Sequence, residues 1–132
     1  MTMTQAELLA DVPQRRRDDA KLPWPVRQLV LARDNWACLC CGKTILGRPY
    51  AVQLRKPRHL GGDISPENLI TVQAQCGDRI TLGCDPADQT RGYEVGPSDD
   101  PASVPVAYST VAGSAKVWLL PDGGRAFERP RD

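Results

Sequence analysis

The sequence predicts a small, loop-rich α+β domain built from short strands, and two observations support this fold class. The chain has 132 residues, which is enough for one modest core and too few for two independent ones. Phe, Trp and Tyr make up 5% of the residues, whereas 12 prolines and 11 glycines interrupt the sequence, so long helices and a wide aromatic core are both disfavoured. A chain of this kind usually needs a cross-link or a metal to hold its fold.

The first half of the chain predicts one clear helix. Pro25 suits the first position of a helix of about 9 residues that begins at Trp24, because apolar residues follow at helical spacing. Ser65 and Pro66 favour a turn or a second helix start, since serine can cap a helix and proline fits its first turn. Elsewhere in this half we expect short extended segments at 45–46 and 50–52, and a basic loop at 55–65.

The second half predicts short apolar segments and a C-terminal β-hairpin. Asp122, Gly123 and Gly124 supply the positive φ values of a tight turn between segments 116–120 and 125–128. Shorter apolar segments precede this hairpin at 69–72, 93–95 and 104–108. The chain is therefore divided into a flexible basic N-terminal arm (1–22), a central domain (23–90) and a C-terminal extension of strands (91–132).

The cysteine content and the absence of long apolar runs favour a cytoplasmic protein. No apolar run approaches the roughly 18 residues of a membrane span, and the N-terminal residues lack the apolar core of a signal peptide. Five cysteines, an odd number, argue against a closed disulfide framework. Reduced thiols are therefore expected, and reduced thiols are available to bind metal.

Charge is distributed unevenly along the chain. Residues 1–60 hold 11 Lys/Arg and 5 Asp/Glu, whereas residues 61–132 hold 6 and 11, although the net charge is only +1. The basic half, which includes Arg15, Arg16 and Arg17 in the arm, suits nucleic acid, and the acidic half suits a protein partner. Solvated surface charge is the alternative explanation for both.

Four of the cysteines are spaced as the ligands of one structural zinc ion. Cys38 and Cys41 have the C-x2-C spacing that lets one turn present two thiolates. Seven residues, of which the first and the last are glycines, separate Cys76 from Cys84. Four thiolates from two loops would form a closed tetrahedral site that contributes folding energy. Cys40 is the spare, and it is also an alternative ligand to Cys38. Four unrelated buried thiols are the simpler alternative.

Four segments form one recognisable pattern: 33–38 (RDNWAC), 41–42 (CG), 52–62 (VQLRKPRHLGG) and 65–71 (SPENLIT). Together they resemble the HNH endonuclease family, particularly its small forms encoded by phages of actinobacteria. The resemblance covers residues 26–86 and implies a ββα-metal fold, often supported by a separate four-cysteine zinc site. In that family an Asp or His metal ligand precedes a histidine base, an asparagine holds the loop, and a late histidine binds the metal.

The resemblance implies that the catalytic positions have changed. The asparagine is retained as Asn68, but the metal-ligand and base positions fall on Gln53 and Leu54, and the late histidine position falls on Asp85. Leucine cannot accept a proton, so the chain is expected to be catalytically impaired, with no catalytic divalent metal. The sole histidine, His59, is the one candidate for a relocated base.

Three functions follow as hypotheses. The first is a pseudonuclease that binds double-stranded DNA, largely through backbone contacts. The second is a protein-interaction module, a phage-encoded binder of a protein in the bacterial host cell, that uses the acidic half and exposed strand edges. The third is an active, divergent endonuclease that uses His59 or Asp85. The residues expected to contact DNA are Arg55, Lys56, Arg58 and His59 in the basic loop, with Arg27 and Arg33 nearby.

Overall fold

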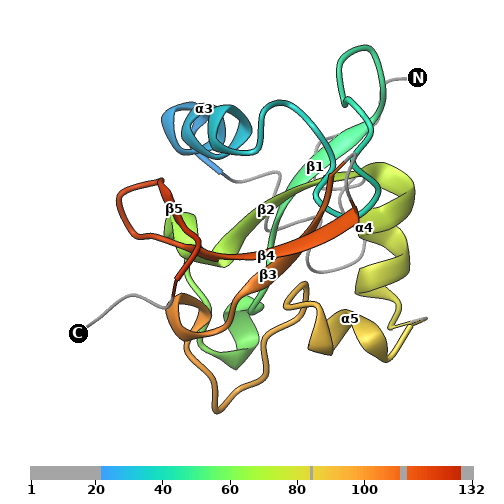
Figure 1. Cartoon of the computed structure of the whole chain (residues 1–132). Coiled ribbons are helices and arrows are strands. Elements are labelled where there is room, and N and C mark those ends of the chain that lie inside the picture. Colours follow the sequence, from blue (N-terminus) through green and yellow to red (C-terminus); the bar gives the residue numbers. More distant parts are fainter. Residues whose placement is uncertain (1–21, 84, 111–112, 129–132) are drawn as a thin grey trace, which may run out of the picture.

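A computed structural model describes residues 22–83, 85–110 and 113–128, and the fold there is α+β with short antiparallel strands. The expected N-terminal arm (1–22) therefore lies almost wholly outside the described residues, as does Cys84. The helices and strands, shown in Figure 1, are α3 (Trp24–Arg33), β1 (Tyr50–Leu54), β2 (Leu69–Gln73), α4 (Ala74–Thr81), α5 (Ala87–Thr90), β3 (Val106–Thr110), β4 (Gly113–Leu119) and β5 (Arg125–Ala126), joined by 3-10 turns η1 (Arg58–Leu60), η2 (Pro66–Asn68) and η3 (Pro101–Ser103).

Helix α3 confirms the helix expected from Trp24. It has a proline in its first turn, where a missing N–H costs no helical hydrogen bond, and it buries Val30 and Leu31. The chain leaves the helix through Asn35 and Trp36, which adopt positive φ values of 56° and 52°. This reversal directs the following residues toward the cysteines.

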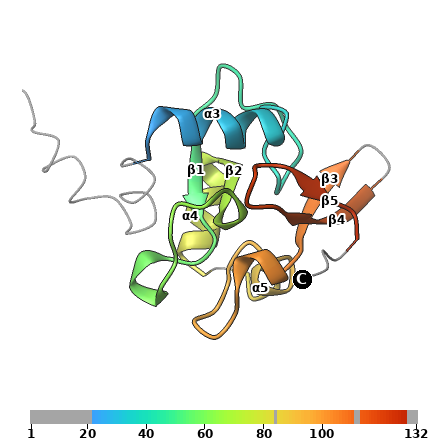
Figure 2. The same cartoon turned by 90° about the vertical axis from the view of Figure 1, so that its left-hand side faces the viewer.

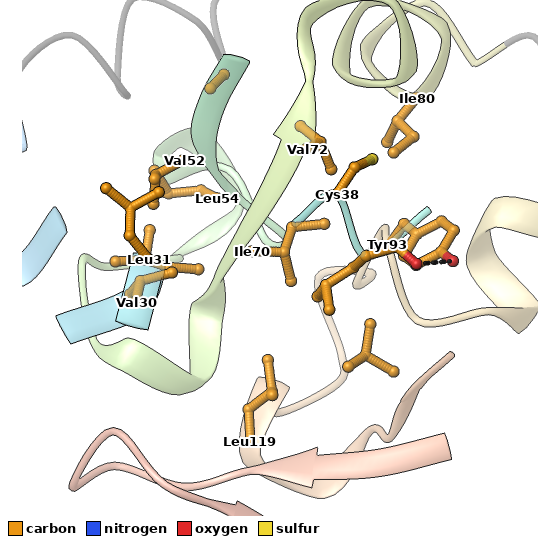
Figure 3. Packing of buried hydrophobic residues seen from close by; sticks show 14 of the residues in the cluster. Val30, Leu31, Cys38, Val52, Leu54, Ile70, Val72, Ile80, Tyr93 and Leu119 are labelled. Atoms are coloured by element: carbon orange, nitrogen blue, oxygen red, sulfur yellow. Dashed lines mark hydrogen bonds between the residues drawn. The ribbon is translucent and has the colours of Figure 1, made fainter. Parts of the chain in front are cut away.

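Strands β1 and β2 form an antiparallel pair that has helices against both faces. Val52 pairs with Thr71 and Gln53 with Ile70, so neighbouring positions along each strand face opposite sides. One face carries Val52 and Leu54 toward Val30 and Leu31 of α3, and the other carries Ile70 and Val72 toward Cys38, Ile80 and Tyr93 (Figure 3). The pair is therefore buried on both sides.

Helix α4 was not expected, because residues 77–83 were interpreted as a glycine-bounded loop. It begins directly after β2 and buries Ile80 against the sheet. Gly77 faces the strand pair so closely that a Cβ there would lie 2.8 Å from the Gln53 side-chain oxygen. The glycine that suggested a loop therefore allows the helix to approach the strand.

The C-terminal strands pack onto the same core. β3 pairs with β4, which pairs with the two-residue β5, and Gly123 in the connecting turn has a φ of +89°, as the expected hairpin requires. Val106, Val117 and Leu119 belong to the hydrophobic cluster that contains α3, β1 and β2. In Figure 2 the three strands stand beside the β1–β2 pair, below α3. The segment after residue 91 thus shares its core with the cysteine-bearing part.

The remaining expectations fared differently. Residues 45–46 form no strand; the nearest extended feature is a single bridge between Ala37 and Thr44. The expected start at Ser65 is a short 3-10 turn, η2, and the basic loop contains another, η1. No helix among the described residues is long and apolar enough to cross a membrane.

Candidate metal centre

Three cysteines from two distant segments meet beside the β1–β2 pair. The Sγ atoms of Cys38, Cys41 and Cys76, here called the thiol cluster, all lie within 4.8 Å of one another. Cys38 is 1% exposed, and its sulfur lies near Val72 and Ile80 in Figure 3. Apolar packing therefore encloses the cluster on the side of the core.

A tight turn presents the first two thiols. The N–H of Gly42 donates to the Cys38 carbonyl at 2.8 Å, and the N–H of Cys38 donates to the Lys43 carbonyl at 2.8 Å. Gly42 has a φ of +76°, which an L side chain rarely adopts, and a Cβ there would also lie 3.1 Å from the Ser109 Cβ. This hydrogen-bonded turn places the Cys38 and Cys41 thiols on the same side of the chain.

Helix α4 supplies the third thiol. Cys76 lies in its first turn, and the helix begins where Gln73 ends β2. Ala74 donates its N–H to the Pro49 carbonyl at 3.0 Å, which ties the helix start to the residue before β1. The Cys41 thiol donates to the Gln73 side-chain oxygen at 3.4 Å, so the turn and the helix start are in direct contact.

Cys40 lies beside the Arg79 side chain, and its thiol is more acidic than that of an ordinary cysteine. The Arg79 guanidinium donates to its sulfur at 2.9 Å. The neighbouring Cys38 thiol, together with Arg79, lowers the pKa of Cys40 to about 6, and Cys40 in turn raises the pKa of Cys38.

The donor set fits a soft divalent cation such as zinc. Sulfurs bound to one zinc at about 2.3 Å lie roughly 3.8 Å apart, which is close to the observed grouping. Thiolates select zinc and similar ions over the hard cations magnesium and calcium. Three of the four expected ligands thus lie together, and the fourth, Cys84, lies outside the described residues. A bound ion would lock the 38–42 turn to α4.

The positions expected to carry catalysis are not members of the thiol cluster, and two of them, Gln53 and Leu54, are fully buried. Leu54 is 0% exposed and packs on the α3 side of the sheet. Gln53 is also 0% exposed, and neither of its side-chain polar atoms has a hydrogen-bond partner among the described residues. Asp85 accepts hydrogen bonds from Arg91 at 2.8 Å and from the Ala87 N–H at 3.0 Å.

Asn68 does hold a loop. Its side-chain oxygen accepts the Lys56 N–H at 2.7 Å, and its amide nitrogen donates to the carbonyls of Lys56 at 2.9 Å and Asp63 at 2.8 Å. Because Asn68 is 0% exposed, these bonds satisfy groups that water cannot reach. The resemblance implied this role, and the hydrogen bonds agree with it.

Two arginines that were expected to contact DNA are buried instead. The Arg55 guanidinium is 0% exposed and donates to the carbonyls of four residues: Glu67, Gly92, Pro101 and Val104. Burial lowers the pKa of Arg55 to about 10, which leaves it charged near neutral pH. Arg33 binds Asp34 and the carbonyls of Pro66 and Leu69. Neither arginine is therefore available to contact a DNA phosphate.

The other four expected DNA contacts lie in two places. Lys56 donates to the carbonyls of Pro97 and Asp99 and lines a hollow of about 360 Å³ that also contains four carboxylates: Asp63, Glu67, Asp99 and Asp100. Arg58 and His59 are exposed on η1 at this end of β1. Arg27 lies on α3, with its guanidinium 5.9 Å from the centre of the Tyr50 ring, at the opposite end of β1.

Sequence reasoning missed a second basic surface. Lys43 and Arg48 line a hollow of about 240 Å³ at the start of α4, and no described residue in its lining is acidic. Tyr50 pairs with Gln73 in the sheet, so Arg27 lies at the same end. The signal available in the sequence was the run of cations that closely follows Cys41, without an intervening acid.

No protein-family model, curated protein or solved structure matches the chain.

Proposed function

We propose that the chain is a zinc-stabilised, HNH-like domain that binds double-stranded DNA and has lost the cleavage chemistry. The observation that carries the proposal is the thiol cluster beside a β-β-α unit, in which Leu54 and Gln53 are fully buried. The sequence resemblance implies that these two residues stand at the positions of the base and the metal ligand. The ion would hold the unit together, and the unit would present cations to DNA.

The loss of cleavage rests on chemistry at the β-β-α unit. A general base needs a proton-accepting atom within hydrogen-bond reach of the attacking water, and Leu54 has none. Gly77 brings α4 against Gln53 and contributes no side-chain donor of its own. Asp85 is engaged by Arg91, and the exposed His59 lies on a 3-10 turn in the basic loop. Binding without cleavage is therefore the activity that remains.

The surface that suits a phosphate backbone comprises Arg27, Lys43 and Arg48, here called the basic end. Lys43 and Arg48 are exposed, and the hollow between them opens on a helix start with no acidic residue in its first turn. At the other end of β1, carboxylates surround Lys56 and would repel phosphate. Backbone contacts of this kind give affinity without sequence preference.

A charge-matched pair of double variants tests the DNA proposal. Lys43→Gln with Arg48→Gln should weaken binding of a duplex about tenfold and reduce the slope of log affinity against log salt by about 1.8. Arg58→Gln with Lys116→Gln removes two exposed cations elsewhere and should leave affinity within about twofold. Equal affinity of the first variant and the wild-type chain would contradict the assignment of the basic end.

A protein partner is the second candidate function, favoured by one surface feature. Phe127 is 74% exposed and lines a hollow of about 470 Å³ together with Tyr108 and Arg125. Aromatic residues and arginine are enriched in the cores of protein interfaces. Strand pairing along β3 is less available, because Leu39 and Arg91 already accept its N–H groups. A host protein retained by the chain after nuclease treatment, and lost in Phe127→Ser, would support this candidate.

A further inference from the structure

We propose that Leu46 is a wedge that enters between neighbouring base pairs when the basic end contacts double-stranded DNA, and that it opens the base stack and unwinds the duplex there. The inference rests on the DNA-binding part of the proposed function. It deepens that function, because a surface that contacts the phosphate backbone would also deform the DNA.

Leu46 occupies an unusual place for a leucine. It stands at the corner of a β-turn formed by residues 45–48, in which the Arg48 N–H donates to the Ile45 carbonyl at 3.0 Å. Gly47, the third residue of this turn, has a φ of +73°. Such turns usually carry glycine, proline, asparagine, aspartate or serine. Leu46 is 66% exposed, so this turn presents an apolar side chain to solvent.

Hydrogen bonds and a buried neighbour fix the turn in place. Ile45, directly before Leu46, is 2% exposed and anchors the turn in the core. Its N–H donates to the Trp36 carbonyl at 2.9 Å, and the Thr44 hydroxyl donates to the same carbonyl at 3.4 Å. The N–H of Leu46 donates to the Thr44 hydroxyl at 3.2 Å. The backbone of Leu46 therefore needs little further ordering to enter a base stack, which favours binding.

The flanking charges favour duplex DNA as the occupant. Lys43 and Arg48 stand on either side of Leu46 in the chain, and both line the hollow at the start of α4, where no described residue is acidic. Figures 1 and 2 show the segment that leads into β1 projecting at the top of the molecule. Proteins that kink DNA combine cations of this kind with an apolar wedge, which in some of them is a leucine.

Plasmid relaxation measures unwinding at any DNA sequence. Closed circular plasmid is relaxed by a topoisomerase in the presence of the full chain, the protein is removed, and the topoisomers are separated on a gel. Each inserted wedge unwinds the duplex, so the wild-type chain should leave the plasmid negatively supercoiled, whereas the topoisomerase alone leaves it relaxed.

Substitution of the wedge should separate unwinding from binding. Leu46→Gln keeps a similar size but is polar, so we expect the change in linking number per bound chain to fall at least about threefold, with affinity for duplex DNA changed less than about fivefold. Leu46→Met, which stays apolar, should keep most of the unwinding. Leu82→Gln is the matched control and should behave as the wild-type chain, because Leu82 is 70% exposed at the other end of α4.

A short duplex with one central mismatch gives a second readout. Unstacking costs less at a mismatch, so the wild-type chain should prefer this duplex to the fully paired one about three- to tenfold, and Leu46→Gln should lose the preference. Lys43→Gln with Arg48→Gln should weaken binding to both duplexes and keep the preference, because the wedge remains in place.

The results that contradict the wedge differ from those that contradict the proposed function. A wild-type chain that binds duplex DNA without unwinding the plasmid, or a Leu46→Gln variant that unwinds it as fully as the wild type, would overturn the wedge alone. A chain that binds no DNA would refute the DNA part of the proposed function, and the wedge with it. Loss of a bound host protein in Leu46→Gln, with unchanged DNA behaviour, would overturn the wedge and place Leu46 in a protein interface.

Discussion

At the residue scale, Arg55 shows how a surface-like sequence motif becomes part of the core. It belongs to the basic run that suggested DNA contacts, yet its guanidinium joins the carbonyls of η2, η3 and the chain on either side of them. Five N–H donors in a planar fork can satisfy several carbonyls at once, and no other side chain can do this. Sequence pattern cannot separate such an arginine from a solvated one.

Replacement of Arg55 should therefore damage stability. Arg55→Met leaves four buried or half-buried carbonyls without their donor, so we expect the free energy of unfolding to fall by about 3–5 kcal/mol in urea titrations. The exposed Arg48→Met serves as the control and should change stability by no more than about 0.5 kcal/mol. Similar small effects of both substitutions would show that the Arg55 hydrogen bonds contribute little.

Asn68 allows a sharper test, because an isosteric change reverses part of its hydrogen bonding. Asn68→Ala removes all three bonds to Lys56 and Asp63 and should cost about 2–3 kcal/mol in thermal or urea unfolding. Asn68→Asp keeps the acceptor for the Lys56 N–H but turns an oxygen toward two carbonyls, so it should be no more stable than the alanine variant. Wild-type stability of the aspartate variant would contradict the assigned amide orientation.

At the element scale, the loop between β1 and β2 depends on a close backbone approach. A Cβ at Gly62 would lie 1.7 Å from the Lys56 carbonyl oxygen, whereas a Cβ at Gly61 would meet only the end of the Lys56 side chain at 4.0 Å. Gly61 has a φ of +96°, so its substitution carries backbone strain alone. Substitution of Gly62 therefore tests steric overlap, and substitution of Gly61 tests backbone strain.

Alanine substitutions should reflect this difference in unfolding measurements. We expect Gly62→Ala to lower the free energy of unfolding by about 3 kcal/mol, and Gly61→Ala by about 1 kcal/mol. The larger loss should accompany faster amide exchange at Lys56, whose N–H is held by Asn68. If Gly61→Ala proves the more damaging change, the Lys56 contact is not what shapes the loop.

The sequence predicts the elements that local chemistry determines, and it misses those that depend on tertiary contact. Helix α3 and the 121–124 turn follow from local chemistry, namely a proline at a helix start and glycines at positive φ, and both were expected. Helix α4 depends on tertiary contact: Gly77 is tolerated because it lies against Gln53. A local rule treats that glycine as a helix breaker, so the helix was missed.

The candidate site divides along the same line. The grouping of Cys38 and Cys41 with Cys76 was predicted from spacing, because two thiols on one turn can face one ion. The contacts of Cys40 with Arg79 and Ser109 were not predicted, because these two residues are distant from Cys40 in the chain. For the same reason, sequence reasoning placed Arg33 and Arg55 on the surface, whereas both side chains are buried and bind partners that are distant in the chain.

At the scale of the whole molecule, the proposed loss of the base predicts binding without cleavage. Plasmid incubated with Mg²⁺ or Mn²⁺ and a large excess of the chain should remain supercoiled, while the same preparation retards duplex DNA in a mobility-shift assay. His59→Ala provides the control for trace activity, since it removes the sole histidine. Nicking that disappears in His59→Ala would establish an active nuclease with a relocated base.

The most direct test of the metal-stabilised fold is native mass spectrometry of the full chain, followed by thermal unfolding with and without a strong chelator. The thiol cluster predicts a mass that corresponds to one bound zinc ion per chain, and a cooperative transition that is lost or strongly lowered when the ion is removed. A metal-free mass together with a thermal transition that the chelator does not change would contradict it.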